Sequence, residues 1–553
     1  MHYELALYSH FPEQQPTYTS IEELAAIWSC STRYAKTIIQ RLANEKAVSW
    51  EAFRGRGKKP ILTLKRTKFE AIHHVFDSLW QQEHFHEAYT LLMSQQLLHH
   101  PVAEKWLMDR YGVQQLPTNE HIFRQPFYKV DVNFDPLNGL SRHDRHFAKQ
   151  LHETLFSYNP ASKTAEANLL FHYETEDNRT WRFIVRKGVY FHNNQQLTAH
   201  DIKWSLERAA SFTDSFFTYE QIVVLHDYEC IITLTKAFSL LPRCLASYRT
   251  AILPRFQEQG KIGCGPFKFV KETDEKLRLN VFPNYFKQRP WIDGIEILYT
   301  DSDAGFGISF TPFHEATPST ELVFNEDGAD FISLNMRTGP LADPLYRETI
   351  YALIDEHEYL IKERREIPAY SWEYGKILKT KAAKVRIPAE QFPPLKIGFQ
   401  QIRDGVNHER EARIFQKALE NYGIESTLEL VDLRLPLTDV SSRYDVFVGG
   451  YALGPDVLLA LIALYTGSST TILDMATVEL QETITELSEK VAHQDETNEM
   501  IDSIRSIEAE LRNAYCLKLL NHRSHRQYIR RNLHYENIQF DSHGRIDYKR
   551  IWM

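Results

Sequence analysis

The sequence predicts a mixed α/β protein in which a small helix-turn-helix domain precedes a much larger α/β body. Two short segments near the N-terminus carry apolar residues at helical spacing, and two segments that alternate as strands follow them. Further along, residues 181–185 alternate as a strand, and Thr198 stands where it can cap a helix that has Asp201 in its first turn. At 553 residues, with 43% hydrophobic and 25% charged residues, the chain is long enough for several globular domains.

Charge is distributed unevenly between the two parts. Residues 1–66 hold ten Lys and Arg against six Asp and Glu, a balance of +4, so the rest of a chain with net charge −9 carries −13. A basic head on an acidic body predicts that the head alone meets a polyanion.

The head begins with two helices. Ser20 and Glu23 have the spacing of a capping box, and the first helix has its apolar residues at Ile21, Leu24, Ala25 and Trp28. Ser31 can cap the second helix, whose apolar face is Ala35, Ile38, Ile39 and Leu42. In a helix-turn-helix the second helix enters the major groove of DNA, so we expect these residues to contact it: Ser31, Thr32, Arg33, Lys36 and Thr37. Arg33 is suited to a bidentate contact with guanine.

A hairpin follows the second helix. Residues 48–53 alternate as a strand, residues 54–60 make a basic turn, and residues 61–64 return as a second strand. We expect its basic side chains to neutralise DNA phosphates: Arg54, Arg56, Lys58 and Lys59. A helix pair or a basic loop alone is common on solvated surfaces, but their order along the chain favours a winged DNA-binding domain. A phosphate-binding loop is excluded because the GxxxxGK[ST] spacing is missing.

These N-terminal segments resemble a known family. The run from Leu24 through residues 30–33 and 55–58 to Leu64 is similar to the N-terminal domain of the SgrR family of transcription regulators. The resemblance continues through residues 69–111, which are helical in pattern and join the head to the body.

The body resembles family 5 of the bacterial extracellular solute-binding proteins. Residues 181–208 match the hallmark segment, and further matches keep the family's order at residues 150–156, 262–267, 284–285, 331–335, 347–355 and 444–445. The resemblance implies a two-lobed, periplasmic-binding-protein-like (type II) solute-binding domain that closes over a ligand. We expect a winged helix-turn-helix at 1–66, a helical connector at 67–118, lobe I at 119–325, lobe II at 326–480, and a return to lobe I at 481–553.

Departures from the family bear on the ligand. Where the family has His-Asp-Gly, this chain has Asn194 in place of the glycine, and Asn tolerates the left-handed turn conformation. Peptide-binding members pair the ligand's amino terminus with an Asp three residues after an aromatic. Here the aligned aromatic is Tyr451 and the third residue after it is Gly454, although a shift of two residues would place Asp456 there. We expect Tyr451, Asp456 and Asn335 to contact a neutral or weakly anionic polyol-like solute rather than a peptide amine.

Three classes of function compete. A regulator whose partners are double-stranded DNA and a small effector (sugar, sugar phosphate or peptide-like solute) accounts for both halves of the chain, and the SgrR resemblance implies that it senses sugar metabolism. The alternative is a solute- or oligopeptide-binding component of an ABC importer, but residues 1–20 do not resemble an export signal. An enzyme is not expected, since no HExxH motif, paired carboxylates or nucleophile elbow occurs. We therefore expect no catalytic residue and no cofactor.

Two further patterns concern metal binding and location. His143 and His146 have the i, i+3 spacing of two metal ligands, but no other ligand accompanies them, so we expect no metal site. The five cysteines are scattered and odd in number, which favours reduced thiols, and no apolar stretch reaches the length of about 18 residues that a membrane span needs. We expect a cytoplasmic protein that does not enter a membrane. The sequence carries no signal for an oligomeric state.

Overall fold

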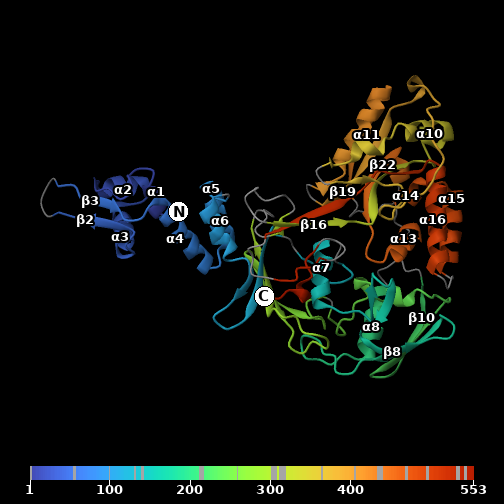
Figure 1. Ribbon diagram of the computed structural model, residues 1–553, viewed down its shortest axis with the longest axis horizontal. Helices are drawn as coiled ribbons and strands as arrows, with labels where there is room; N and C mark the ends of the chain where they lie inside the picture. Colours follow the sequence, from blue (N-terminus) through green and yellow to red (C-terminus); the bar gives the residue numbers. More distant parts are fainter. Residues whose placement is uncertain are drawn as a thin grey trace. The chain divides into compact units, whose positions relative to one another are not determined.

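The computed structural model describes residues 3–53, 58–98, 100–129, 132–138, 142–210, 217–257, 259–300, 308–309, 319–362, 365–403, 406–432, 440–466, 471–492, 497–530, 536–540 and 545–553. The chain forms two compact units, and Figure 1 labels some of their elements. Unit 1 consists of Met1–Val130, Val270–Leu279 and Gly294–Gly307. Unit 2 consists of Asp131–Phe269, Asn280–Asp293 and Ile308–Met553. The limits of the two lobes given above stay a prediction.

The head of unit 1 is a winged helix-turn-helix (Figure 1). Its helices are α1 (Tyr3–Leu7), α2 (Ile21–Ile27) and α3 (Thr32–Asn44). Its strands β1 (Thr17–Tyr18), β2 (Val48–Glu51) and β3 (Ile61–Leu64) form an antiparallel sheet of order β1-β3-β2. The helices and the sheet share one core, in which Leu7, Leu24, Trp28, Ile38, Leu42 and Leu62 are buried.

The two helix starts predicted for the head are confirmed. Ser20 Oγ accepts a hydrogen bond from the Glu23 amide at 3.1 Å, and Glu23 Oε2 accepts one from the Ser20 amide at 3.0 Å, which completes the capping box. Ser31 Oγ accepts from the Tyr34 amide at 3.3 Å and caps α3. A cap of this kind contributes about 1 kcal/mol to helix stability. Sequence reasoning missed α1 and β1, which are too short to show a period.

The segment predicted as a helical connector contains three helices and ends with a strand, and its limits at 67–118 stay a prediction. Its helices are α4 (Lys68–Gln81), α5 (Phe85–Ser94) and α6 (Pro101–Met108). These helices share their core with Leu298, which belongs to a five-stranded sheet. The sheet has the order β12-β13-β14-β5-β4, with β4 (Gly112–Gln115), β5 (His121–Phe127), β12 (Phe267–Glu272), β13 (Lys276–Val281) and β14 (Gly294–Tyr299).

A buried lysine joins the connector to this sheet. Lys276 Nζ lies 2.5 Å from Glu83 Oε1, in the turn between α4 and α5, and 2.9 Å from Glu296 Oε1 on β14. Arg124 Nε donates to Glu296 Oε2 at 2.7 Å. Burial alone would raise the pKa of Glu296, but Arg124 and Lys276 outweigh it and lower that pKa to about 2. The exposed Glu83 of the connector is therefore paired with a buried lysine of the sheet, in addition to the apolar contacts of the shared core.

Unit 2 contains a four-stranded antiparallel sheet of order β10-β11-β9-β8. Its strands are β8 (Leu170–Glu174), β9 (Thr180–Val185), β10 (Tyr219–His226) and β11 (Glu229–Leu234). In β9 the residues Trp181, Phe183 and Val185 are buried in alternation with more exposed ones, as predicted.

The turn and the helix after β9 also follow the sequence-based expectation. Asn194 has φ 66°, the left-handed conformation expected of it. Helix α8 (Ala199–Ala210) starts after Thr198, whose amide and Oγ1 both donate to Asp201 Oδ2 at 2.9 Å. The helix therefore begins directly after the predicted cap residue, and the carboxylate oxygen that accepts hydrogen bonds there belongs to Asp201.

A second sheet of unit 2 has the order β20-β19-β22-β17-β23, with β21 paired to β19. Its strands β19 and β22 are labelled in Figure 1. Its strands are β17 (Gly328–Leu334), β19 (Leu395–Arg403), β20 (Val406–Asn407), β21 (Ser426–Asp432), β22 (Val446–Ala452) and β23 (Leu517–Leu519). Helices α10 (Pro344–Ala352) and α11 (Glu409–Tyr422) share one core with the sheet through Ile350 and Phe415. A separate core contains Phe331 and Phe447 together with α13 (Val457–Thr466), α14 (Thr471–Met475), α15 (Val478–Ala492) and α16 (Thr497–Asn513).

Unit 2 contains further helices and strands outside these two sheets. They are α7 (Arg142–Leu151), α9 (Leu241–Cys244), α12 (Val440–Arg443), β6 (Phe156–Asn159), β7 (Thr164–Ala167), β15 (Ile308–Ser309), β16 (Ser319–Asn325), β18 (Ile367–Pro368), β24 (Asn521–His522) and β25 (Ser524–Arg530). In the part of the chain that the structure describes, no helix combines the length and apolar composition of a membrane span.

Candidate nucleic-acid interface and solute site

Helix α3 presents the predicted DNA-contacting residues to solvent. Its buried stripe of Ala35, Ile38, Ile39 and Leu42 packs on the core of the head, so its other side faces outward. Ser31, Thr32, Arg33, Lys36 and Thr37 are all exposed. Arg33, Lys36 and Thr37 lie together on the outward side of α3, whereas Ser31 and Thr32 are exposed at its N-terminal end.

Other exposed residues of α3 were missed by the sequence reasoning, and two of them lie on or beside its outermost stripe. Gln40 shares the outermost stripe with Arg33 and Thr37, because residues at i, i+4 and i+7 lie on one helix face. An amide side chain on that stripe is suited to adenine. Tyr34 is 46% exposed beside the same stripe. Continuing the helical period past Thr37 would have identified Gln40.

The wing is only partly covered by the structure. Arg54 and Arg56 lie outside the described residues, whereas Lys58 and Lys59 are both exposed. Lys59 Nζ lies 2.9 Å from Glu23 Oε1, the carboxylate that also caps α2. The Lys59 hydrogen bond, with those from Thr19 and Ser20, lowers the pKa of Glu23. Lys59 therefore ties the base of the wing to the start of the helix-turn-helix.

The side-chain amide of Asn335 is buried in unit 2 and hydrogen-bonded to backbone groups there. Asn335 is 1% exposed, and its Nδ2 donates to the carbonyls of Ser441 at 2.6 Å and Tyr444 at 2.9 Å. Its Oδ1 accepts from the amides of Arg337 at 2.8 Å and Thr338 at 3.1 Å. In this conformation Asn335 fastens the end of β17 to α12, and a solute contact would have to replace one of these bonds.

Tyr451 lies in an aromatic cluster at the end of β22. Its ring stacks on Phe331 with centroids 5.4 Å apart and an interplanar angle of 6°, and it meets Trp372 at 6.2 Å. Burial raises the pKa of its hydroxyl. Three residues later, a Cβ built on Gly454 would meet nothing within 4 Å. A side chain at 454 would have room, so the missing carboxylate is a feature of the sequence and not a steric necessity.

Asp456 is already paired with an arginine. Arg243 on α9 donates from Nε to Asp456 Oδ2 and from Nη2 to Asp456 Oδ1, both at 2.6 Å, and the two side chains are 10% and 11% exposed. Arg243 Nη2 also lies 3.1 Å from the Tyr158 hydroxyl. Asp456 Oδ1 accepts from the Leu459 amide at 3.1 Å and so caps α13. This carboxylate has its counter-charge within the protein.

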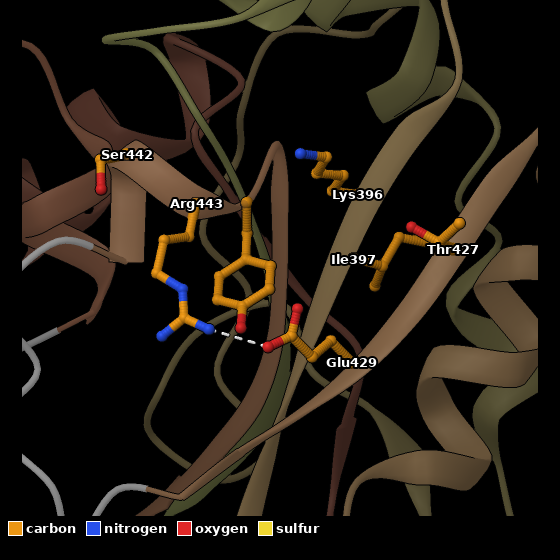
Figure 2. A pocket seen from close by; sticks show the side chains of 7 residues that line it. Lys396, Ile397, Thr427, Glu429, Ser442 and Arg443 are labelled. Carbon is orange, nitrogen blue, oxygen red and sulfur yellow. Dashed lines mark hydrogen bonds and ion pairs between the residues drawn. The ribbon is translucent and has the colours of Figure 1, made fainter.

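A polar hollow of about 330 Å³ lies at the β21 edge of the second sheet of unit 2 (Figure 2). Arg443 Nη2 lies 2.8 Å from Glu429 Oε1 across it. Burial, and then the hydrogen bond to Glu429, raises the pKa of Tyr444 to about 12. The lining residues are Lys396, Ile397, Thr427, Glu429, Ser442, Arg443 and Tyr444, so none of the three predicted solute contacts lines the hollow.

The histidines considered as metal ligands lie on α7. His143 and His146 are both buried, at 6% and 7% exposure. Within the described residues, no group of three His, Cys, Asp or Glu side chains is arranged to hold a metal ion.

Sequence comparisons match both halves of the chain. Residues 2–111 match the family described as "Sugar transport-related sRNA regulator N-term", and residues 161–306 match "Bacterial extracellular solute-binding proteins, family 5 Middle". The HTH-type transcriptional regulator SgrR of Escherichia coli (strain K12) is 25% identical over 433 residues, 75% of this chain and 76% of its own. The uncharacterized protein YhjP of Bacillus subtilis (strain 168) is 28% identical over 443 residues, 75% of this chain and 76% of its own.

Solved structures confirm the predicted fold of the body. A dipeptide-binding protein from Pseudoalteromonas sp. SM9913, in complex with Met-Leu, superposes with a TM-score of 0.64 at 14% identity and covers 78% of this chain and 99% of its own. NikA from Brucella suis, in complex with Fe(III)-EDTA, superposes with a TM-score of 0.65 at 16% identity over 78% of this chain and 99% of its own. The chain therefore carries an SgrR-type N-terminal domain followed by a family 5 solute-binding domain, and it is a homologue of the SgrR transcriptional regulators.

Proposed function

We propose that the protein is a cytoplasmic one-component transcription regulator. It binds double-stranded DNA through the winged helix and senses a small solute, such as a sugar, a sugar phosphate or a related metabolite, in its solute-binding domain. The observation that carries the proposal is the outward stripe of α3, where Arg33, Lys36 and Thr37 stand exposed on a basic winged-helix head. The E. coli and Shigella homologues named as HTH-type transcriptional regulators support it.

The solute-binding domain supplies the regulatory input. A solute that binds one arrangement of the lobes better than another shifts their equilibrium, and operator affinity changes by the coupling free energy, typically about 1–3 kcal/mol. Because Asp456 is paired with Arg243, an ammonium ligand at that carboxylate would have to break a nearly buried ion pair. This supports a neutral or weakly anionic solute. We propose a binding function and no catalytic step.

DNA binding is tested by selecting duplexes from a random pool with the full chain and then comparing Arg33→Ala with Lys58→Ala in gel shifts. Loss of a base contact by Arg33→Ala should cost about 1–3 kcal/mol on the selected duplex and relax the preference at one position. Lys58→Ala should weaken all duplexes alike and reduce the salt slope by about 1. If the wild-type chain and both variants select nothing and bind no duplex, the head is not a DNA-binding domain.

The importer alternative predicts a different location. All five cysteines are free thiols, which fits a reducing compartment. Cell fractionation should recover the chain at its full length from the cytoplasm. Recovery of a processed form outside the cytoplasmic membrane would favour the importer component instead.

A further inference from the structure

We infer that Tyr34 and Arg41 form a second, phosphate-contacting stripe on α3, and that Tyr3 of α1 holds both side chains in position. The inference rests on the proposed DNA-binding function. It adds two DNA contacts and one positioning residue to those expected from the sequence.

Tyr34 and Arg41 lie one above the other on the same flank of α3. Residues seven apart on a helix differ by about 20° in direction, so these two side chains form one stripe. Both are exposed, Tyr34 at 46% and the Arg41 side chain at 54%. They border the outermost stripe that contains Arg33. When a recognition helix lies in the major groove, its outermost stripe faces the base edges, while adjacent side chains meet sugar and phosphate.

Tyr3 holds this flank from the side. Its ring meets that of Tyr34 edge-on, with centroids 6.2 Å apart and an interplanar angle of 82°, and the Arg41 guanidinium carbon lies 5.6 Å from the Tyr3 ring centroid. Trp28 fixes Tyr3 in turn, because its Nε1 donates to the Tyr3 carbonyl at 2.9 Å and its ring meets the Tyr3 ring at 6.0 Å. Side chains that are already ordered lose less conformational entropy when they bind.

The chemistry of both groups suits phosphate. A side-chain hydrogen bond to Tyr34 raises the pKa of Tyr3. A phenol hydroxyl can accept one hydrogen bond and donate another, so Tyr34 can stay bonded to Tyr3 while it donates to a phosphate oxygen. Besides its contact with the Tyr3 ring, the Arg41 guanidinium has a long contact to an exposed carboxylate, 3.9 Å from Nε to Glu45 Oε1, which a phosphate can replace. Tyrosine hydroxyls and guanidinium groups are both common donors to DNA phosphates.

The test measures the affinity of the full chain for a random-sequence duplex by fluorescence anisotropy, between about 50 and about 200 mM salt. Tyr34→Phe should weaken binding about fivefold on every sequence and leave the salt slope unchanged, because it removes a neutral donor. Arg41→Met should weaken binding and reduce the slope by about 1. Tyr3→Phe should cause a smaller loss, and adding Tyr34→Phe to it should cost less than Tyr34→Phe alone. Tyr190→Phe, at a tyrosine of unit 2 that is 37% exposed, is the matched control and should bind like the wild type.

The outcomes separate this inference from the proposed function. If Lys36→Ala weakens DNA binding while Tyr34→Phe or Arg41→Met binds like the wild type, the proposal that Tyr34 and Arg41 both contact phosphate is wrong. The proposed DNA-binding function then still stands. If Tyr3→Phe and Tyr34→Phe have independent, additive effects, Tyr3 is not the positioning residue. If the wild-type chain binds no duplex at any salt concentration, the proposed function itself fails.

Discussion

The ion pair between Arg243 and Asp456 allows a quantitative test of how unit 2 is held together. The two charged groups are 10% and 11% exposed and joined by two hydrogen bonds of 2.6 Å. Removing one partner of a buried pair leaves the other charge without compensation, which costs about 3–5 kcal/mol. Replacing both by neutral groups of similar size is often close to neutral. We therefore expect Arg243→Met and Asp456→Asn each to destabilise the protein strongly, and the double variant to be more stable than either.

The assay is urea unfolding of the full chain for the four proteins of the double-mutant cycle, followed by tryptophan fluorescence. The coupling free energy should reach about 2 kcal/mol or more, because the first substitution leaves a buried charge without its partner and the second substitution removes that charge. The exposed pair Arg182 and Glu174, with side chains 50% and 53% exposed, is the matched control, and its coupling should stay below about 1 kcal/mol. A coupling below about 0.5 kcal/mol for Arg243 and Asp456 would show that the pair does not act as a buried unit.

Three other predictions concern ligand choice, local packing and pH. Isothermal titration of the wild-type chain with di- to pentapeptides should show no binding. The Gly454→Asp variant, which places a carboxylate in open space, should gain peptide binding. Micromolar peptide binding by the wild type that Asp456→Asn abolishes would overturn this expectation. Gly450→Ala should lower the urea midpoint of unfolding and Gly454→Ala should not, because a Cβ at position 450 would lie 2.4 Å from Asp330 Oδ1 and 2.6 Å from His408 Nε2. Equal urea midpoints for the two variants would contradict the tight packing at Gly450. Burial lowers the pKa of His152 and of His192 to about 4, so the unfolded chain takes up these protons first as pH falls below about 6.5. Stability should fall between about pH 6.5 and about pH 4 by up to about 3 kcal/mol per histidine, and His152→Gln should flatten that dependence in urea titrations at each pH.

The features predicted correctly from the sequence are mostly local. The cap at Ser20 follows from the spacing of two residues three positions apart. The turn at Asn194 follows from the family resemblance, because Asn tolerates the left-handed conformation of the glycine that it replaces. Arg243 and Asp456 are 213 positions apart, and no sequence pattern near either residue indicates that they pair. For Asn335 the family resemblance suggested a solute contact, but the amide is used by backbone groups of Ser441 and Tyr444, which only the folded arrangement brings near.

Helix α3, which we propose contacts DNA, shows both the strength and the limit of periodicity. Its buried stripe was predicted in full, and the exposed residues followed as its complement. Tyr34 was passed over because an exposed tyrosine has no special meaning in a sequence. Its contact with Tyr3 depends on α1, a five-residue helix with no detectable period.

The buried lysine between connector and sheet has a consequence for the order in which the protein is made. Glu83 and Lys276 are 193 positions apart, so a ribosome releases the connector long before the strand that supplies its buried cation. Until then the connector also lacks Leu298 from its core, whereas the winged helix, whose core lies within residues 3–64, already has every residue of that core. During synthesis we therefore expect a folded DNA-binding head followed by an unfinished connector. A nascent chain released before residue 299 should expose the connector's apolar face to proteases and chaperones.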